Sequence, residues 1–158
     1  MSTLTGGKFL TFSLGREEYG VSIGLVKEIN GMMEITPVPG APHYIKGVIN
    51  LRGKIVPVMD LRLRFGLPEA EYTARTCLIV FEVGDNAKRL FSIAVDGVSE
   101  VLNIQTAEIE PPARYSEQSE QFLLGLGKTK AKVVLLLDVL RVTDVILGEI
   151  IEQAGGQI

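Results

Sequence analysis

The N-terminal part of the chain alternates hydrophobic and polar side chains with a period of two, which is the pattern of half-buried β-strands. Residues 8–14 and 19–23 each alternate in this way on either side of a short polar turn. Residues 26–29 predict a third strand. Three prolines within residues 37–42 then predict an irregular loop.

A second group of strands is predicted around residues 44–66. Residues 47–51 and 55–59 are apolar and rich in β-branched side chains, which favours two strands joined by a turn at Gly53. Asp60 follows directly and predicts the N-cap of a short helix, because its carboxylate can accept hydrogen bonds from free backbone N–H groups.

The second half of the chain repeats this order of elements at constant offsets. In the first block, Tyr19, Val21, Ile23, Val26, Glu28 and Ile29 match, in order and spacing, Phe91, Ile93, Val95, Val98, Glu100 and Val101. In a second block, at a slightly longer constant offset, Gly47, Ile55, Val56, Asp60 and Leu61 match Gly125, Val133, Val134, Asp138 and Val139. Such blocks favour a duplication over chance, so the two aspartates are predicted to be equivalent N-caps.

Two similar units of short strands and frequent turns predict two small β-barrels, since closure of a sheet removes its exposed edges. The first barrel is expected at about residues 8–68 and the second at about residues 75–138. Residues 139–152 carry apolar side chains at helical spacing and predict a C-terminal helix that caps the second barrel. The pattern leaves open whether the N-terminal strand pairs with the first or the second barrel.

Composition narrows the range of functions. Hydrophobic residues make up 46% and charged residues 22% of the chain, as in ordinary globular domains. The net charge of −3 argues against a nucleic-acid-binding protein that relies on bulk electrostatics. No apolar run reaches the roughly 20 residues of a membrane-spanning helix, and the N-terminus lacks the features of a secretion signal. We therefore expect a cytoplasmic protein with no direct membrane insertion.

Few residues could support catalysis. His43 is the only histidine and no nucleophile signature accompanies it, while Cys77 opens an apolar strand and is expected to pack in the core. Residues 125–129 end like a phosphate-binding loop, but Phe122 stands where that loop requires glycine, and a strand follows instead of a helix. No catalytic residue, cofactor or metal is assigned.

Residues 44–53 read Tyr-Ile-Lys-Gly-Val-Ile-Asn-Leu-Arg-Gly, and residues 55–62 read Ile-Val-Pro-Val-Met-Asp-Leu-Arg. This stretch resembles the CheW family, the coupling proteins of bacterial chemotaxis. Shorter matches extend the resemblance over most of residues 9–145. The resemblance implies one CheW-like domain over residues 1–158, mainly β, with two SH3-like five-stranded β-barrels packed together, short helices and a C-terminal helix.

The resemblance also implies a non-enzymatic adaptor that links chemoreceptor cytoplasmic tips to the regulatory domain of the histidine kinase CheA. Such adaptors work at receptor arrays on the inner face of the membrane, and weak self-association in rings is expected. Family positions that contact the receptor, in a groove between the barrels, correspond to Val26, Glu28, Gly47, Arg52 and Val101. A ring contact with the kinase corresponds to Glu110 and Tyr115.

The residues themselves leave two sites open. One is a basic cluster, which is either a solvated surface or a site for an acidic or amide-rich partner; it comprises Arg52, Lys54, Arg62 and Arg64. The other is an apolar set, which either lines a groove for a partner helix or lies in a core shared by the barrels; it comprises Val26, Ile29, Val98 and Val101.

The function has alternatives as well. Adaptors of related pilus or gliding motility pathways share the same pattern. A double-barrel module that binds a peptide or a nucleic acid outside signalling is a further possibility.

Overall fold

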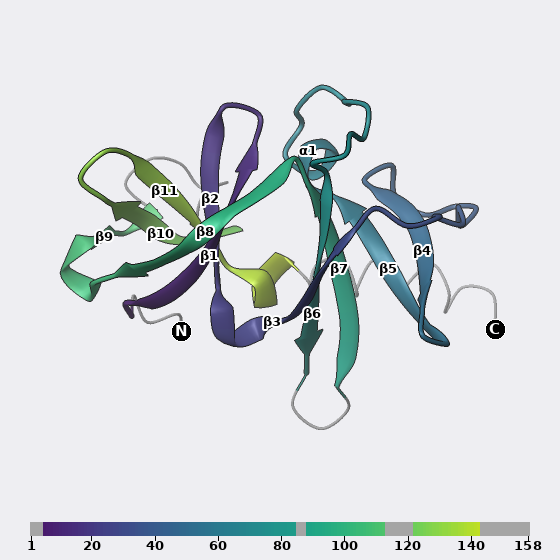
Figure 1. The fold of residues 1–158 in the computed structure, drawn as a ribbon, viewed down its shortest axis with the longest axis horizontal. Coiled ribbons are helices and arrows are strands. Elements are labelled where there is room, and N and C mark those ends of the chain that lie inside the picture. The colour runs from purple at the N-terminus through teal and green to yellow at the C-terminus, as the bar shows by residue number, and fades with distance from the viewer. Residues whose placement is uncertain (1–4, 85–87, 113–121, 143–158) are drawn as a thin grey trace.

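The structure is a computed structural model that describes residues 5–84, 88–112 and 122–142 (Figure 1). Its strands are β1 (Gly7–Leu14), β2 (Glu17–Ser22), β3 (Val26–Gly31), β4 (Ile45–Leu51), β5 (Lys54–Asp60), β6 (Cys77–Val83), β7 (Arg89–Val95), β8 (Gly97–Ile104), β9 (Ile109–Glu110), β10 (Leu123–Lys128) and β11 (Val133–Leu137). The short helices are η1 (Ile23–Leu25), α1 (Leu61–Arg64) and η2 (Thr106–Glu108). The mainly β fold predicted from the sequence is confirmed.

The strands form two sheets that do not follow the predicted contiguous division of the chain. The six-stranded barrel has the order β8-β1-β2-β11-β10-β9, and the five-stranded barrel has the order β3-β6-β7-β5-β4. Each barrel therefore takes its first hairpin from the other repeat, and the segments 8–68 and 75–138 are not the barrels. The β1–β2 and β6–β7 hairpins are alike in pattern, so the sequence does not distinguish which barrel each hairpin completes.

The strand registers support the duplication. Val58 of β5 lies opposite Ser92 of β7, and Leu136 of β11 lies opposite Gly20 of β2, both in parallel pairs. The two pairs are repeat equivalents, because the offsets found in the sequence relate Val58 to Leu136 and Gly20 to Ser92. The β4–β5 and β10–β11 hairpins also carry a bulge at the same repeat position. The two-residue β9 is an addition to the predicted five strands.

Asp60 and Asp138 are N-caps, as predicted. The Asp60 carboxylate accepts a hydrogen bond from the Leu63 N–H at 3.3 Å, and the Asp138 carboxylate accepts one from the Arg141 N–H at 3.1 Å. Both aspartates are buried. Residues 139–142 are helical, and the remainder of the predicted C-terminal helix lies outside the described residues.

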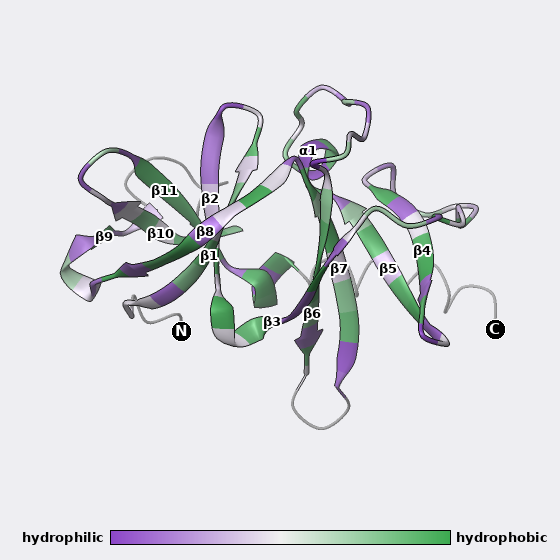
Figure 2. Ribbon diagram, in the orientation of Figure 1, coloured by the Kyte–Doolittle hydropathy of each residue, from purple (hydrophilic) through white to green (hydrophobic). Residues whose placement is uncertain are grey.

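The largest hydrophobic cluster lies between the barrels and joins residues of both. It contains Phe12 of β1, Phe81 of β6 and Phe91 of β7, together with Leu61 and Val139 from the two equivalent helix starts. Smaller clusters fill each barrel. Figure 2 shows hydrophobic residues recurring along β5, β6 and β7. Since each fully buried large apolar side chain contributes about 1.5–3 kcal/mol, the shared cluster makes the two barrels one unit.

Candidate functional site

The β4–β5 hairpin presents Arg52 at a two-residue turn. Arg52 and Gly53 both have positive φ, at 51° and 87°, a geometry that matches the twist of antiparallel strands. The Gly53 N–H donates to the Asn50 side-chain oxygen at 2.8 Å, which fixes the turn. The turn therefore fixes the backbone position from which the Arg52 side chain extends, and 67% of that side chain is exposed.

Arg52 forms an ion pair with Glu28 of β3. Its Nη2 donates to Glu28 Oε1 at 2.7 Å. Because β3 and the β4–β5 hairpin lie at opposite ends of the strand order, this pair spans the two edges of the five-stranded barrel. The hydrogen bond from Arg52 holds the pKa of Glu28 below its usual range, although partial burial opposes the shift. The structure thus brings together two of the five residues predicted to contact a receptor.

The apolar set divides into two pairs. Val26 and Val98, which are equivalent in the two repeats, are partly buried and pack against the shared core. Ile29 and Val101, also equivalent, are exposed, and Val101 is exposed to 50%. Val26 in addition lines an open hollow of about 490 Å³. Val26 and Val98 therefore belong to the edge of the core shared by the barrels, whereas Ile29 and Val101 lie at the surface.

Gly47 is buried in β4 and is approached by the chain itself. A Cβ at this position would collide with the carbonyl oxygen of Thr36. Thr36 and Val48 exchange two backbone hydrogen bonds of 2.9 Å across this point. The loop at Thr36 therefore packs directly on Gly47 and needs the absence of a side chain there. A direct contact of Gly47 with a receptor stays a prediction.

The basic cluster is only partly a surface. The Arg64 guanidinium lies over the rings of Tyr44 and Phe122, with its central carbon 4.8 Å and 4.5 Å from the two ring centroids. These two aromatic residues occupy equivalent repeat positions, at the same offset that relates Asp60 to Asp138. Arg62 also turns inward, and only the two basic residues of the hairpin tip extend from the surface as a solvated patch.

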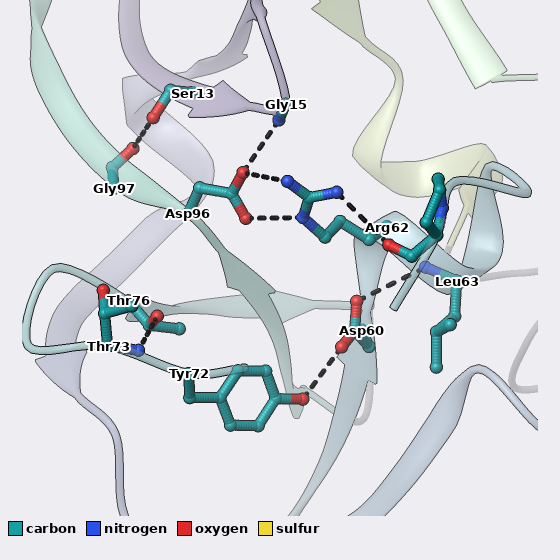
Figure 3. Close-up of polar contacts among 11 residues, drawn as sticks. Ser13, Gly15, Asp60, Arg62, Leu63, Tyr72, Thr73, Thr76, Asp96 and Gly97 are labelled. Atoms are coloured by element: carbon teal, nitrogen blue, oxygen red, sulfur yellow. Dashed lines mark hydrogen bonds and ion pairs between the residues drawn. The ribbon is translucent and has the colours of Figure 1, made fainter. Parts of the chain in front are cut away.

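Arg62 is held by Asp96, the single residue between β7 and β8. Its Nε donates to Asp96 Oδ1 and its Nη2 donates to Oδ2, both at 3.0 Å, while the Gly15 N–H donates to Oδ2 at 2.8 Å (Figure 3). Gly15 belongs to the β1–β2 turn of the six-stranded barrel, whereas Arg62 follows β5 of the five-stranded barrel. The interaction therefore links the two barrels.

Sequence reasoning missed Asp96, although the repeat contained a signal. The residue equivalent to Asp96 is Gly24, so the acid departs from the duplicated pattern. The sequence groups Arg62 with the other basic residues because its partner lies 34 residues away in the chain and no local pattern reveals the pair. A charged residue that appears in one repeat only, beside a turn, is the feature that could have drawn attention to it.

The six-stranded barrel carries a looser counterpart of the Glu28–Arg52 pair. Glu100, which is equivalent to Glu28, lies 3.7 Å from the Nζ of Lys132, and Glu18 lies 3.3 Å from the same nitrogen. Burial acts to raise the pKa of Glu18, but a hydrogen bond with Ser99 and the charge of Lys132 hold that pKa below its usual value.

The predicted kinase contact is only half within the described residues. Glu110 of β9 lies 3.9 Å from the Nζ of Lys128, and β9 pairs with β10. Tyr115 lies outside the described residues.

Within the described ranges, no three residues of His, Cys, Asp or Glu are placed to hold a metal. In those same ranges, no helix has the length and apolar character needed to cross a bilayer.

Comparison with known proteins decides the family. The sequence profile of the CheW-like domain matches residues 8–146, which is most of the chain. The chain belongs to the CheW family. It is 40% identical over 135 residues to the chemotaxis protein CheW of Klebsiella aerogenes, covering 85% of this chain and 80% of that protein.

Further relatives support the same conclusion for this CheW-family chain. The crystal structure of the scaffolding protein TtCheW from Thermoanaerobacter tengcongensis matches it with a TM-score of 0.77 and 36% identity, over 85% of this chain and 90% of that one. Protein FrzA of Myxococcus xanthus is 31% identical over 119 residues, covering 75% of this chain and 72% of FrzA. The chain is thus a non-enzymatic chemotaxis scaffold with an SH3-like double-barrel fold.

Proposed function

We propose that this CheW-family protein couples the cytoplasmic tips of chemoreceptors to the histidine kinase CheA. The observation that carries the proposal is the exposed Arg52 head, which is held in place by Glu28, two residues along β3 from the partly buried Val26 that lines the hollow. A helix from a receptor would bury its apolar stripe on the valine and offer polar groups to the arginine. Val101 would add apolar surface from the other barrel.

The kinase is proposed to bind at a separate surface, near Glu110 and Tyr115. There its regulatory domain would pair barrel against barrel with this protein and build rings, with weak self-association as a consequence. The same role would recruit the protein from the cytoplasm to receptor arrays at the inner face of the membrane. No nucleic acid is proposed as a partner.

Replacement of Arg52 by alanine tests the receptor surface. Loss of one charge-assisted hydrogen bond costs about 1.5–3 kcal/mol, so Arg52→Ala should weaken binding of a receptor helical-hairpin fragment at least about tenfold. Lys54→Ala is the matched control, because it removes a second exposed basic residue from the same hairpin. Calorimetric titration of each folded variant gives the affinities. Wild-type affinity for Arg52→Ala would place the receptor surface elsewhere.

The kinase surface has its own test in the same assay. Truncation of an aromatic anchor at an interface commonly costs about 2 kcal/mol, so Tyr115→Ala should weaken binding of the CheA regulatory domain. Arg52→Ala should leave kinase binding near normal, and Tyr115→Ala should leave receptor binding near normal. If both variants lose both partners equally, the two surfaces are not separate.

An adaptor of a related pilus or gliding motility pathway is the second candidate function. The similarity to FrzA, a relative whose name does not mention chemotaxis, favours keeping it. Pull-down experiments with the kinases of the competing pathways from the same organism distinguish the two. Capture of a motility kinase without CheA would favour the second candidate.

A further inference from the structure

The duplication relates two places where the chain passes from one barrel to the other. The first passage is the single residue Asp96 between β7 and β8, and the second is η1 between β2 and β3, whose middle residue Gly24 is equivalent to Asp96. The residues that follow the fifth strands are equivalent too, with Arg62 in one repeat and Leu140 in the other. The two ends of the seam between the barrels can therefore be compared position by position.

The two ends are built in opposite ways. At the first, the Arg62 guanidinium and the Gly15 N–H hold the Asp96 carboxylate with three hydrogen bonds. At the second, Gly24 and Leu140 line the open hollow of about 490 Å³, and a Cβ added to Gly24 would meet no atom of the described residues within 4 Å. We call the first place the closed end of the seam and the second the open end.

An aromatic stack strengthens the closed end. The ring of Tyr19, from β2 of the six-stranded barrel, stacks on Phe65, which follows α1 of the five-stranded barrel, with centroids 5.5 Å apart. Aromatic pairs at such distances prefer particular orientations, and a forked guanidinium–carboxylate pair is directional as well. The shared apolar core, in contrast, has no preferred direction. The closed end thus carries directional contacts between the two barrels.

We propose that the Arg62–Asp96 pair is a positioning device that sets the relative orientation of the two barrels and, through it, the receptor surface. The inference rests on the proposed function for the identity of the partner, because that surface takes Val26 from one barrel and Val101 from the other. Neither Arg62 nor Asp96 touches the partner. Both act through the angle at which the valines are presented, and the open end of the seam accommodates the adjustment.

A distance measurement between the barrels tests this without any partner. Spin labels are attached at Glu34→Cys on the five-stranded barrel and at Ala107→Cys on the six-stranded barrel, both exposed positions, in a Cys77→Ser background. The parent should give one narrow distance by pulsed electron paramagnetic resonance. Asp96→Asn should shift or broaden it, and Arg62→Lys, which keeps the charge but loses the fork, should give a smaller change.

Glu69→Gln is the matched control. It removes an ion pair with Lys46 of 2.7 Å that does not join the barrels, so its distance distribution should equal that of the parent. Circular dichroism confirms that each variant is folded, and Arg62→Lys carries the test if Asp96→Asn does not fold. Unchanged distributions in the Arg62 and Asp96 variants, or an equal change in Glu69→Gln, would overturn the proposal.

Receptor titration completes the test. Residues that touch neither ligand commonly change coupling between sites by about 0.5–2 kcal/mol, so Asp96→Asn should lower receptor affinity about twofold to thirtyfold. Parent affinity in a variant with an altered distance would overturn the link from orientation to binding. Failure of the parent itself to bind the receptor counts against the proposed function instead, and the distance result then decides the positioning role alone.

Discussion

The two repeats share the pairing of their last strands and differ in the side chains that follow the fifth strand. After β5 the helix has Arg62 and Arg64, whereas the equivalent positions after β11 are Leu140 and Val142. In the first repeat the polar side chains reach Asp96 and an aromatic pair, while in the second Val142 is buried in the shared core. Side chains at equivalent positions therefore make electrostatic contacts in the first repeat and apolar contacts in the second.

The comparison of the repeats separates features that both copies share from features that only one copy has. The strand registers, the bulge in the last hairpin and one aspartate cap are present in each repeat, so these features form the duplicated framework of the fold. The Arg62–Asp96 pair and the tight Glu28–Arg52 pair have no equally close counterpart among the described residues of the second repeat. Of these two unduplicated features, the Glu28–Arg52 pair lies in the proposed receptor surface.

The largest effect is expected where the framework is most crowded. Gly47→Asp places a side chain against the Thr36 carbonyl, at a φ of 145° that side chains rarely adopt, and buries a charge. Overpacking and an unpaired buried polar group together should cost more than about 3 kcal/mol in the free energy of unfolding. Denaturant titration measures this loss.

Gly53→Ala is the control for Gly47→Asp. Gly53 has a φ of 87° in the same hairpin, but a Cβ there meets no atom within 4 Å, so only backbone strain of about 1 kcal/mol is expected. Loss of receptor binding by Gly47→Asp would then report misfolding of β4. A Gly47→Asp variant with parent stability and no receptor affinity would show instead that a receptor contacts this position directly.

A smaller effect, and a measurable asymmetry, is expected at the caps. Asp60→Ala removes the acceptor for the Leu63 N–H and also for the Tyr72 hydroxyl, which donates to Asp60 at 2.9 Å, whereas Asp138→Ala removes the cap of the Arg141 N–H. We expect about 2 kcal/mol for Asp60→Ala and about 1 kcal/mol for Asp138→Ala.

Thermal and denaturant unfolding of the two cap variants provide the comparison. Tyr72→Phe in the parent isolates the hydroxyl and should account for most of the difference between them. Burial and the hydrogen bond to Asp60 raise the pKa of Tyr72, so this hydroxyl is protonated and can donate its hydrogen bond when unfolding is measured at neutral pH. Equal losses of unfolding free energy for the two cap variants would show that the Tyr72 hydrogen bond adds nothing measurable to the Asp60 cap.

The sequence was sufficient for everything that depends on local pattern. Alternation placed the strands, a constant offset revealed the duplication, and Asp60 and Asp138 were assigned as caps because the side chain and the N–H that it accepts lie three residues apart. The hairpin segment also carried enough identity to indicate the CheW family. Each of these features is encoded within a short stretch or in the comparison of two stretches.

What could not be predicted depends on contacts between distant segments. The exchange of hairpins depends on whether β1 pairs with β8 or with β3, and alternating strands accept either neighbour. Asp96 meets Arg62 and Gly15 only because that exchange brings the β1–β2 turn beside α1. The collision partner of Gly47 is likewise supplied by an irregular loop, whose path no periodicity describes.

The smallest effect concerns Glu28 and tests whether its pair with Arg52 persists in solution. The Arg52 hydrogen bond keeps the pKa of Glu28 below its usual range, so the pair stabilises the fold above the pKa of the unfolded carboxyl and ceases to do so as pH falls through the lower folded value. Arg52→Ala should raise the Glu28 pKa, and Lys54→Ala should leave it nearly unchanged. Titration of the side-chain carboxyl carbon by nuclear magnetic resonance reads this pKa directly. An equal Glu28 pKa in the parent and in Arg52→Ala would mean that the arginine is not held, and a receptor would then have to order it on binding.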